Sequence, residues 1–288
     1  MDNPTFYIVD VFAEKKYAGN QLAVVTDAGA ISGAQMQMIA LEMNFSETTF
    51  ILSDEERNGS YDVCIFTPKE EVPFAGHPTL GTAYVIAHEI EAKPAERIVL
   101  NLKGGQIPVN LGDVSWMRQQ PATFGDTFTI ERLSRVLGLD DTDLDERFPI
   151  QAISTGLSCI VAPLKNLDAL KRCRVARDAY YDLISATQAK AILVFSPETY
   201  DKADLSVRFF ADYYGVPEDP ATGSANGCLA GYLVEHRYFD TDSVDARVEQ
   251  RYEIERPSLL YLRAERKEGK IDISVGGKVQ MVARGELL

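Results

Sequence analysis

Short runs of alternating hydrophobic and polar positions dominate this chain, and such runs are typical of β-strands. In the first half, strands are expected at residues 6–12, 21–25, 45–52, 61–67, 98–102 and 106–111. Apolar residues recur at helical spacing behind Ser32, a favourable N-cap residue, and the predicted helix ends near Asn44. The first half is therefore expected to place many strands around one buried helix.

The second half repeats this mixture of elements. Strands are expected there at residues 149–155, 158–163, 191–196, 207–211, 246–252, 259–265, 271–275 and 279–286, and helices at 130–137, 167–173 and 180–187. Residues 122–126 are linker-like, and the pairs Gly104-Gly105 and Gly276-Gly277 are interpreted as turns. We expect an N-terminal half, 1–118, and a C-terminal half, 119–277, with a last strand at about 278–288 that could return to the first half.

Two stretches about half the chain apart share one residue pattern. His77-Pro78 is followed by Gly81, and Asp219-Pro220 is followed by Gly223 at the same spacing. Because proline is favoured at the first helical position, each stretch predicts a helix start with His77 or Asp219 at or near the N-cap. We interpret the pattern as a duplicated half, with two helix ends facing each other across a cleft. The alternative is a chance match in a chain with 13 Pro and 20 Gly.

The two predicted helix starts suggest a site for an acid. A helix N-terminus has backbone N–H groups without intrahelical partners and a favourable dipole, so it binds carboxylates and phosphates well. Small residues such as Gly81, Gly223 and Ser224 would let a ligand approach the backbone closely. We therefore expect the N–H groups at Gly76, Gly223 and Ser224 to hold a small carboxylate-bearing substrate.

Charge and composition narrow the function classes. A formal charge of −14 and a pI near 4.7 argue against nucleic-acid binding, which normally needs a basic surface. A small anion is compatible with this charge, because a few local N–H groups can hold it. The chain has no signal-like segment and no run of 18 apolar residues, so we predict a cytoplasmic protein without membrane contact.

No motif for a metal or cofactor is found. The four cysteines are scattered without a CxxC pair, so we expect inert thiols and neither zinc nor disulfides. Dinucleotide-binding, P-loop, zinc-protease and serine-hydrolase motifs are also missing. Any chemistry would therefore depend on ordinary acid/base side chains.

Three polar residues at element ends are candidates for proton transfer. Glu47 begins an otherwise apolar strand, where partial loss of solvent would raise the pKa of its carboxyl group toward the useful range. His77 and Asp219 could face it or each other. The alternatives are a solvated edge glutamate, a structural histidine and a plain N-cap.

Several longer motifs together resemble the PhzF-like family, which takes its name from the phenazine-biosynthesis isomerase. They cover nearly the whole chain in order: Asp10-Val11-Phe12, Gly19-Asn20, 43–50, 65–68, 73–81, 215–225 and Gly276-Gly277. The resemblance implies an α+β fold like that of diaminopimelate epimerase. In this fold, two pseudo-symmetric domains each wrap a curved, mostly antiparallel sheet around a central helix, with the active site between the domains. It also implies a homodimer and no cofactor.

The resemblance further implies roles for individual residues. A glutamate at the position of Glu47 is the catalytic acid/base in this family, and residues matching His77, Asp219 and Ser224 complete the site. With the helix-start hypothesis, this makes Glu47, His77 and Asp219 the predicted catalytic residues. The predicted substrate-binding residues are Asn20, Ser46, Gly76, Gly223 and Ser224.

The expected activity is a cofactor-independent isomerase or epimerase. The name-giving enzyme isomerises trans-2,3-dihydro-3-hydroxyanthranilate by moving a proton between ring carbons. Residues 154–159 are closer to generic family members, which leaves the substrate open. A catalytically silent acid-binding or scaffolding protein is the alternative. A two-thiol racemase is a third option, but neither helix start carries a cysteine.

Overall fold

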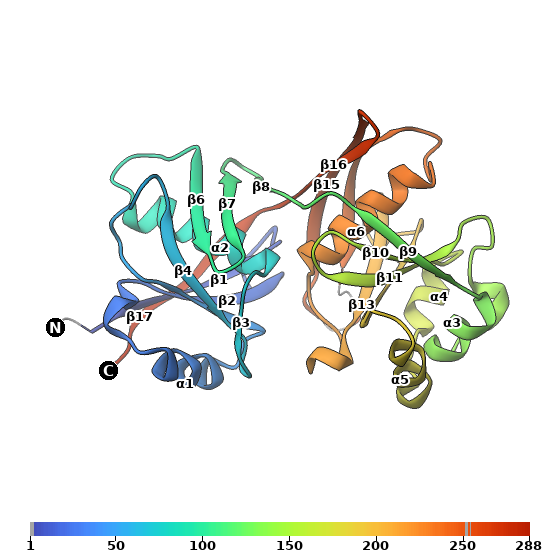
Figure 1. Ribbon diagram of the computed structural model, residues 1–288, viewed down its shortest axis with the longest axis horizontal. Coiled ribbons are helices and arrows are strands. Elements are labelled where there is room, and N and C mark those ends of the chain that lie inside the picture. The colour runs from blue at the N-terminus through green and yellow to red at the C-terminus, as the bar shows by residue number, and fades with distance from the viewer. Residues whose placement is uncertain (1–2, 251–252, 254) are drawn as a thin grey trace. The chain divides into compact units, whose positions relative to one another are not determined.

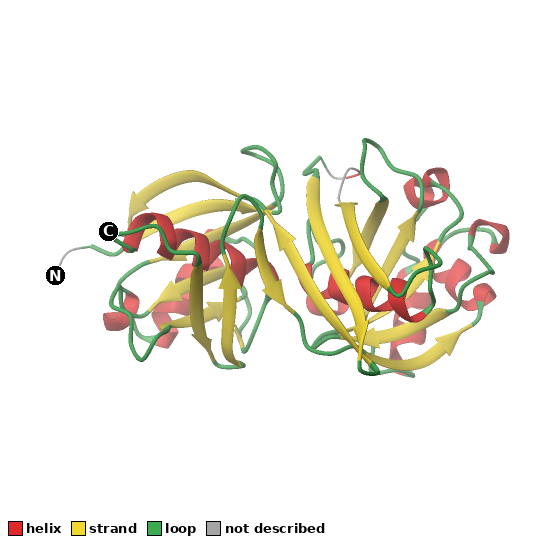
Figure 2. Cartoon of the chain, turned by 90° about the horizontal axis from the view of Figure 1, so that it is seen from above, coloured by secondary structure: helices red, strands yellow, loops and turns green. Residues whose placement is uncertain are grey.

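The computed structural model describes residues 3–250, 253 and 255–288. The chain divides into two compact units, one formed by residues up to 118 together with 276–288 and the other by 119–275. In each unit strands outnumber helices (Figures 1 and 2). The expected α+β class is confirmed.

The first unit is a mostly antiparallel sheet around helix α2 (Gly76–Val85). Its strands are β1 (Thr5–Val11), β2 (Asn20–Val25), β3 (Glu47–Ile51), β4 (Tyr61–Phe66), β5 (Glu71–Val72), β6 (Arg97–Leu102), β7 (Gly105–Asn110), β8 (Ser115–Arg118) and β17 (Val279–Glu286). The pairs β2–β3 and β4–β6 are parallel, and the pairs β17–β1, β1–β2, β3–β4, β4–β5, β6–β7 and β7–β8 are antiparallel. The last strand therefore pairs with the first.

Helix α2 is buried on every side. All of its residues except Tyr84 are buried, and it packs against strands from both edges of the sheet. A helix that is apolar all round is stable only in such a core. A Cβ added at Gly81 would lie 2.6 Å from Leu22 Cδ2 and 2.8 Å from Val11 Cγ2, so the glycine allows the close approach of helix and sheet. Gly81 therefore serves packing, not the predicted approach of a ligand.

Helix α1 (Gly33–Met43), which the sequence pattern predicts, covers the outer side of β3 and β4. Ser32 and Gln35 form a capping box at its start, and Asn44 takes the left-handed conformation that ends it. Met36 and Ala40 pack into a core with Phe50. The capping residue and the helical spacing of apolar residues were therefore sufficient to predict this helix.

The second unit repeats this architecture around helix α6 (Gly223–Glu235). Its strands are β9 (Thr123–Phe128), β10 (Ile150–Ser154), β11 (Ser158–Pro163), β12 (Ala191–Ser196), β13 (Leu205–Phe210), β14 (Ser243–Gln250), β15 (Ser258–Lys267) and β16 (Lys270–Gly277), whose last two residues belong to the first unit. Helices α3 (Ile130–Leu137), α4 (Leu167–Arg172) and α5 (Arg177–Ser185) supply the second core layer.

The strand directions show the duplication. From β1 to β7 in the first unit, omitting β5, successive pairs are antiparallel, parallel, antiparallel, parallel and antiparallel. From β10 to β15 in the second unit the same series recurs. In both units the central helix follows the fourth strand of the series, so α2 and α6 are equivalent elements.

Three sequence expectations are wrong in detail. Residues 122–126 are not a linker, because 123–128 form β9 and pair with β10. Gly276 and Gly277 do not form a turn. A Cβ at Gly276 would lie 2.7 Å from the Trp116 ring, and one at Gly277 would lie 2.3 Å from the Phe12 ring, so both glycines allow an aromatic ring to cover the strand.

The helix starts are the third correction. Helix α2 begins at Gly76 with Ala75 as N-cap, so Pro78 is its third residue. Helix α6 begins only at Gly223 with Thr222 as N-cap, so Asp219 is not a cap. Gly81 and Gly223, which match in sequence, therefore lie at different positions of their helices.

Candidate active site

Glu47 and His77 meet at one edge of the first unit. The Nε2 atom of His77 lies 3.5 Å from Oε2 of Glu47, and the exposed fractions of the two side chains are only 6% and 18%. This distance is longer than a normal N–H···O hydrogen bond, and such contacts commonly shorten when a substrate binds. The structure thus brings together two of the three predicted catalytic residues.

The parallel pairing of β2 and β3 explains this meeting. Glu47 is the first residue of β3 and is in register with Leu22, while Asn20 is the first residue of β2. The amino ends of the two strands therefore share one edge, and helix α2, whose second residue is His77, packs against both strands. Asn20 is 1% exposed, and its Nδ2 lies 3.3 Å from Nδ1 of His77.

These contacts favour one form of the imidazole. When the Asn20 NH₂ donates to Nδ1 of His77, Nε2 of the neutral ring carries the proton. That N–H is directed to the Glu47 carboxylate. Burial lowers the pKa of His77 from its usual 6.5 to about 3, while a hydrogen bond with the Gln21 backbone acts in the opposite direction. At neutral pH the His77 ring is therefore uncharged, and its contact with Glu47 is not an ion pair.

The other two predicted residues of the first unit flank this pair. Gly76 is buried and is the first residue of α2, next to His77. Ser46 is half-buried and directly precedes β3. Thr48, on the other side of Glu47, is fully buried, and its hydroxyl has no hydrogen-bond partner among the described residues.

In the second unit, Asp219 lies in a hydrogen-bonded segment before α6. Its Oδ2 accepts from the Thr222 hydroxyl, and its backbone N–H donates to Phe209. Gln250, at the end of β14 and 1% exposed, donates to the Asp219 carbonyl at 3.0 Å and accepts from the Thr222 N–H at 3.3 Å. These bonds keep 219–222 outside the helix, which is why α6 starts later than predicted.

The start of α6 carries the remaining predicted residues. Gly223 is buried and Ser224 half-buried. Asn226 donates to the Thr222 carbonyl at 3.0 Å and to Gln250 Oε1 at 2.9 Å, and the Thr155 hydroxyl donates to the Ser224 carbonyl at 3.2 Å. Sequence reasoning missed Gln250, Asn226 and Thr155, because no local pattern links residues so far apart in the chain.

The cysteines lie beside these arrangements. All four are free, and Cys159, Cys173 and Cys228 are buried. The single S–H of Cys228, in α6, lies within hydrogen-bond distance of the carbonyls of Ile153 and Leu157, and its sulfur lies 3.6 Å from the Thr155 hydroxyl. It is therefore turned toward β10 and the turn that follows it.

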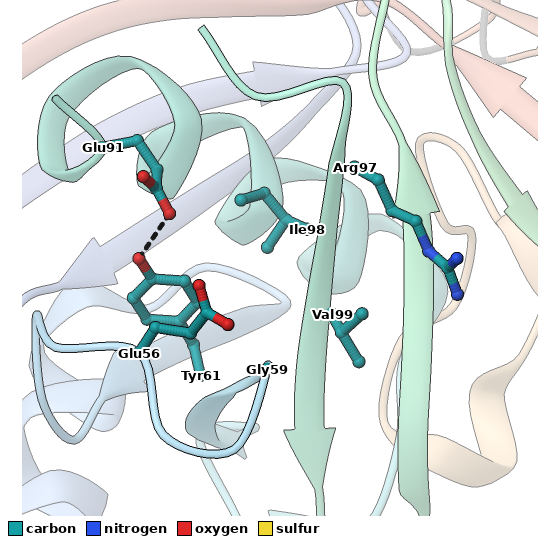
Figure 3. A pocket seen from close by; sticks show the side chains of 7 residues that line it. All are labelled: Glu56, Gly59, Tyr61, Glu91, Arg97, Ile98 and Val99. Atoms are coloured by element: carbon teal, nitrogen blue, oxygen red, sulfur yellow. Dashed lines mark hydrogen bonds between the residues drawn. The ribbon is translucent and has the colours of Figure 1, made fainter. Parts of the chain in front are cut away.

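A separate cavity of about 310 Å³ lies elsewhere in the first unit. Figure 3 shows Tyr61 and Glu91 pointing toward each other, joined by a hydrogen bond of 2.7 Å, with Arg97 directed away from both. Tyr61 begins β4, whereas Phe66 at its other end pairs with Thr48, next to Glu47. The cavity thus lies at the end of β4 remote from Glu47, and none of the predicted site residues lines it.

The described part of the chain has neither a metal-binding cluster nor a membrane-spanning helix. Within residues 3–250, 253 and 255–288, no group of three or more His, Cys, Asp or Glu side chains is arranged to hold a metal ion. No helix among the same residues has both the length and the apolar character to cross a membrane.

Comparisons with known proteins agree with this fold. The family model of phenazine biosynthesis-like proteins matches residues 9–285. Trans-2,3-dihydro-3-hydroxyanthranilate isomerase of Pseudomonas aeruginosa is 33% identical over 287 residues, which cover 97% of this chain and 98% of that protein. An uncharacterised isomerase of Clostridium acetobutylicum is 31% identical over 295 residues, which cover 98% and 97% of the two chains.

The solved structures extend the same result. A PhzF-family phenazine biosynthesis protein of Bacillus anthracis superimposes with a TM-score of 0.92 at 28% identity, over 100% of both chains. The fold and the named relatives place the protein among isomerases and epimerases. Within that class, the chain belongs to the phenazine biosynthesis-like, or PhzF, family.

Proposed function

We propose that this isomerase moves a proton on a small carboxylate-bearing substrate, with Glu47 as the single acid/base. The observation that carries the proposal is the buried contact chain from Asn20 through neutral His77 to Glu47. A proton carrier must keep a defined position and still change its protonation state, and a neutral N–H donor stabilises the carboxylate form without adding a charge.

The proposed reaction conserves electrons. The Glu47 carboxylate takes a proton from a substrate carbon, and the electron pair of the broken C–H bond moves into the conjugated system. The resulting carboxylic acid returns the proton to another carbon, or to the other face of the same carbon. This sequence involves no net oxidation or reduction.

Asp219 and the start of α6 are proposed to serve the same reaction. The N–H groups of Gly223 and Ser224 belong to the first turn of a 13-residue helix, where an anionic group is favoured. Asp219, held by Thr222 and Gln250, is proposed to position or assist the substrate. Asn20, Ser46 and Gly76 complete the proposed binding set.

The substrate class follows from the relatives only as a proposal. The Pseudomonas aeruginosa relative is named for trans-2,3-dihydro-3-hydroxyanthranilate, an amino- and hydroxyl-bearing acid, and we propose an acid of this kind for the present protein. We also propose a homodimer, as the family resemblance implies. Sedimentation velocity tests this point, and a single species of 31.9 kDa would contradict it.

Proton exchange in D₂O, followed by NMR, tests the function. The substrates are trans-2,3-dihydro-3-hydroxyanthranilate and a panel of small amino and hydroxy acids. Wild type should introduce deuterium at a carbon of at least one acid, and Glu47→Gln should reduce the rate by about 10³-fold, in the range of general acid/base catalysis. Glu42→Gln, at an exposed position of α1, is the matched control and should keep the wild-type rate.

The possible outcomes separate the alternatives. Equal exchange by wild type and Glu47→Gln would remove Glu47 from the mechanism. Binding of an acid without exchange by wild type would favour a catalytically silent protein. Thermal unfolding of each variant establishes that a lost activity is not a lost fold.

A further inference from the structure

Gln119 is a buried side chain with unmet hydrogen-bonding capacity. It is only 7% exposed, and neither Nε2 nor Oε1 has a hydrogen-bond partner among the described residues. Burying a polar group without a partner is unfavourable, and the large majority of buried side-chain polar atoms in proteins are paired. Such an amide is therefore a candidate for a group that binds a ligand.

The surroundings of Gln119 lead to the first turn of α6. A Cβ added at Gly227 would lie 3.0 Å from Cγ and 3.3 Å from Oε1 of Gln119, and 3.1 Å from the Thr155 hydroxyl. The Cα–Cβ direction of a helical residue tilts toward the helix N-terminus, and residue 223 lies on the same face one turn earlier. The carboxamide thus lies along the face of α6 that leads to the N–H groups of its first turn.

The backbone around Gln119 fixes this placement. Its N–H donates to the Ile273 carbonyl at 2.9 Å. Three residues further on, Ala122 covers Gly231, where an added Cβ would lie 2.9 Å from the alanine methyl group. The segment therefore crosses α6 at Gly227 and Gly231. Gln119 lies at Gly227, which is nearer the start of the helix than Gly231.

We infer that the Gln119 carboxamide is a substrate-binding and specificity-determining group of the second unit. The inference deepens the proposed function and rests on its assignment of an acid to the start of α6. A carboxamide offers both a donor and an acceptor, whereas the helix N–H groups only donate. It therefore recognises a substituent that the helix start cannot, namely an amino or hydroxyl group that donates to Oε1.

A second buried amide supports this location. Asn226, in the first turn of α6 and 0% exposed, uses its Nδ2 for Thr222 and Gln250, but its Oδ1 has no hydrogen-bond partner among the described residues. Two acceptor oxygens near a set of N–H donors match an acid that also carries a donor group. The substrate class assigned is thus a carboxylate with an amino or hydroxyl substituent close to it.

Three planar acids test the inference without any reaction. Benzoate, salicylate and anthranilate all have one aromatic ring and one carboxylate. Next to the carboxylate, benzoate has no substituent, salicylate has a hydroxyl group and anthranilate has an amino group. Isothermal titration calorimetry should show wild type binding anthranilate or salicylate about three- to tenfold more tightly than benzoate, the effect of one net hydrogen bond. In Gln119→Met this ratio should fall to about 1.

A matched variant and a stability measurement complete the experiment. Gln188→Met changes an exposed glutamine of the same unit and should keep the wild-type ratio. Because methionine removes an unsatisfied buried amide and nearly conserves its length, Gln119→Met should unfold at the same temperature as wild type or higher. A merely structural amide would instead give a lower unfolding temperature and an unchanged ratio, which would overturn the inference.

Two further outcomes are decisive. If wild type binds all three acids equally or binds none of them, the assigned substrate class is wrong. The Glu47→Gln variant should keep the wild-type ratio, because the recognition assigned to Gln119 involves no proton transfer. Failure of the proton-exchange experiment together with a Gln119-dependent ratio would therefore refute the proposed reaction and leave the binding role of Gln119 in place.

Discussion

The two central helices occupy equivalent places in their units, but their starts are built from different chemistry. At the start of α2, the partly buried Glu47 contacts His77, so the side chains there include titratable ones. At the start of α6, buried amides dominate, with Gln250 and Asn226 holding Thr222. Amides keep one protonation state at all ordinary pH values. In our proposal, proton transfer is therefore centred on the α2 start, whereas the α6 start, where Asp219 is held by Thr222 and Gln250, mainly binds the acid.

This contrast also explains the distribution of buried, unsatisfied polar atoms. Among the described residues, those without a hydrogen bond include atoms of Thr48 and His77 near one helix start and of Gln119 and Asn226 near the other. Functional sites are where folds tolerate such local costs, so these atoms fit the two places where we propose that a substrate binds.

The largest expected effect concerns the amide network of α6. Replacing Gln250 by leucine would leave the Asp219 carbonyl, the Thr222 N–H and the Asn226 amide without their partner. Each stranded buried group costs about 1–3 kcal/mol, so we expect the free energy of unfolding to fall by about 3 kcal/mol. Urea denaturation measures this change. Gln188→Leu is the control, and a loss below about 1 kcal/mol for Gln250→Leu would show that the network does not hold this segment.

A smaller effect tests the packing of α2. In Gly81→Ala the new methyl group would meet Leu22 and Val11 at 2.6 and 2.8 Å, and overpacking of this kind costs about 1–3 kcal/mol. Gly33→Ala is the matched control, since Gly33 begins α1 and an added Cβ there has no atom within 4 Å. Thermal unfolding should show a lower midpoint for Gly81→Ala and no loss for Gly33→Ala. Equal midpoints for both variants would mean that Gly81 is not a packing residue.

The sequence predicted elements better than it predicted their exact starts. Alternation and cap residues are local signals, so helix α1 and most strands could be predicted from them. The late start of α6 could not, because Gln250, which holds Asp219 and Thr222, is distant in sequence. Strand β9 was missed for a similar reason, since its residues 123–128 are mostly exposed and depend on pairing with β10.

The candidate site shows the same division between local and distant information. Glu47 and His77 could be singled out by residue type and position, but their contact depends on the parallel register of β2 and β3. Gln119 lies in a stretch that had no periodic pattern to mark it. Its burial and its unpaired amide are properties of the folded chain alone.

A third expected effect is a pH dependence of stability that comes from His77 at the α2 start. In the folded protein the pKa of His77 is about 3, against 6.5 for an exposed histidine. Between these values the unfolded chain binds a proton that the folded chain does not, so stability falls as pH decreases from about 6.5 toward 3. The slope of one such group is about 1.4 kcal/mol per pH unit. Above about pH 7.5 His77 should contribute no slope.

Urea denaturation of wild type and His77→Gln isolates this contribution. Measurements from about pH 4.5 to about pH 8 cover the range in which an exposed histidine titrates. Below pH 6, the difference in the free energy of unfolding between the two proteins should change by about 1.4 kcal/mol per pH unit. At the alkaline end this difference should not change with pH. His88→Gln, at an exposed position of the same unit, is the matched control. Parallel curves for wild type and His77→Gln would mean that the ring is not held neutral. The contrast between the two helix starts would then lose its physical basis, since neither would carry a perturbed titratable group.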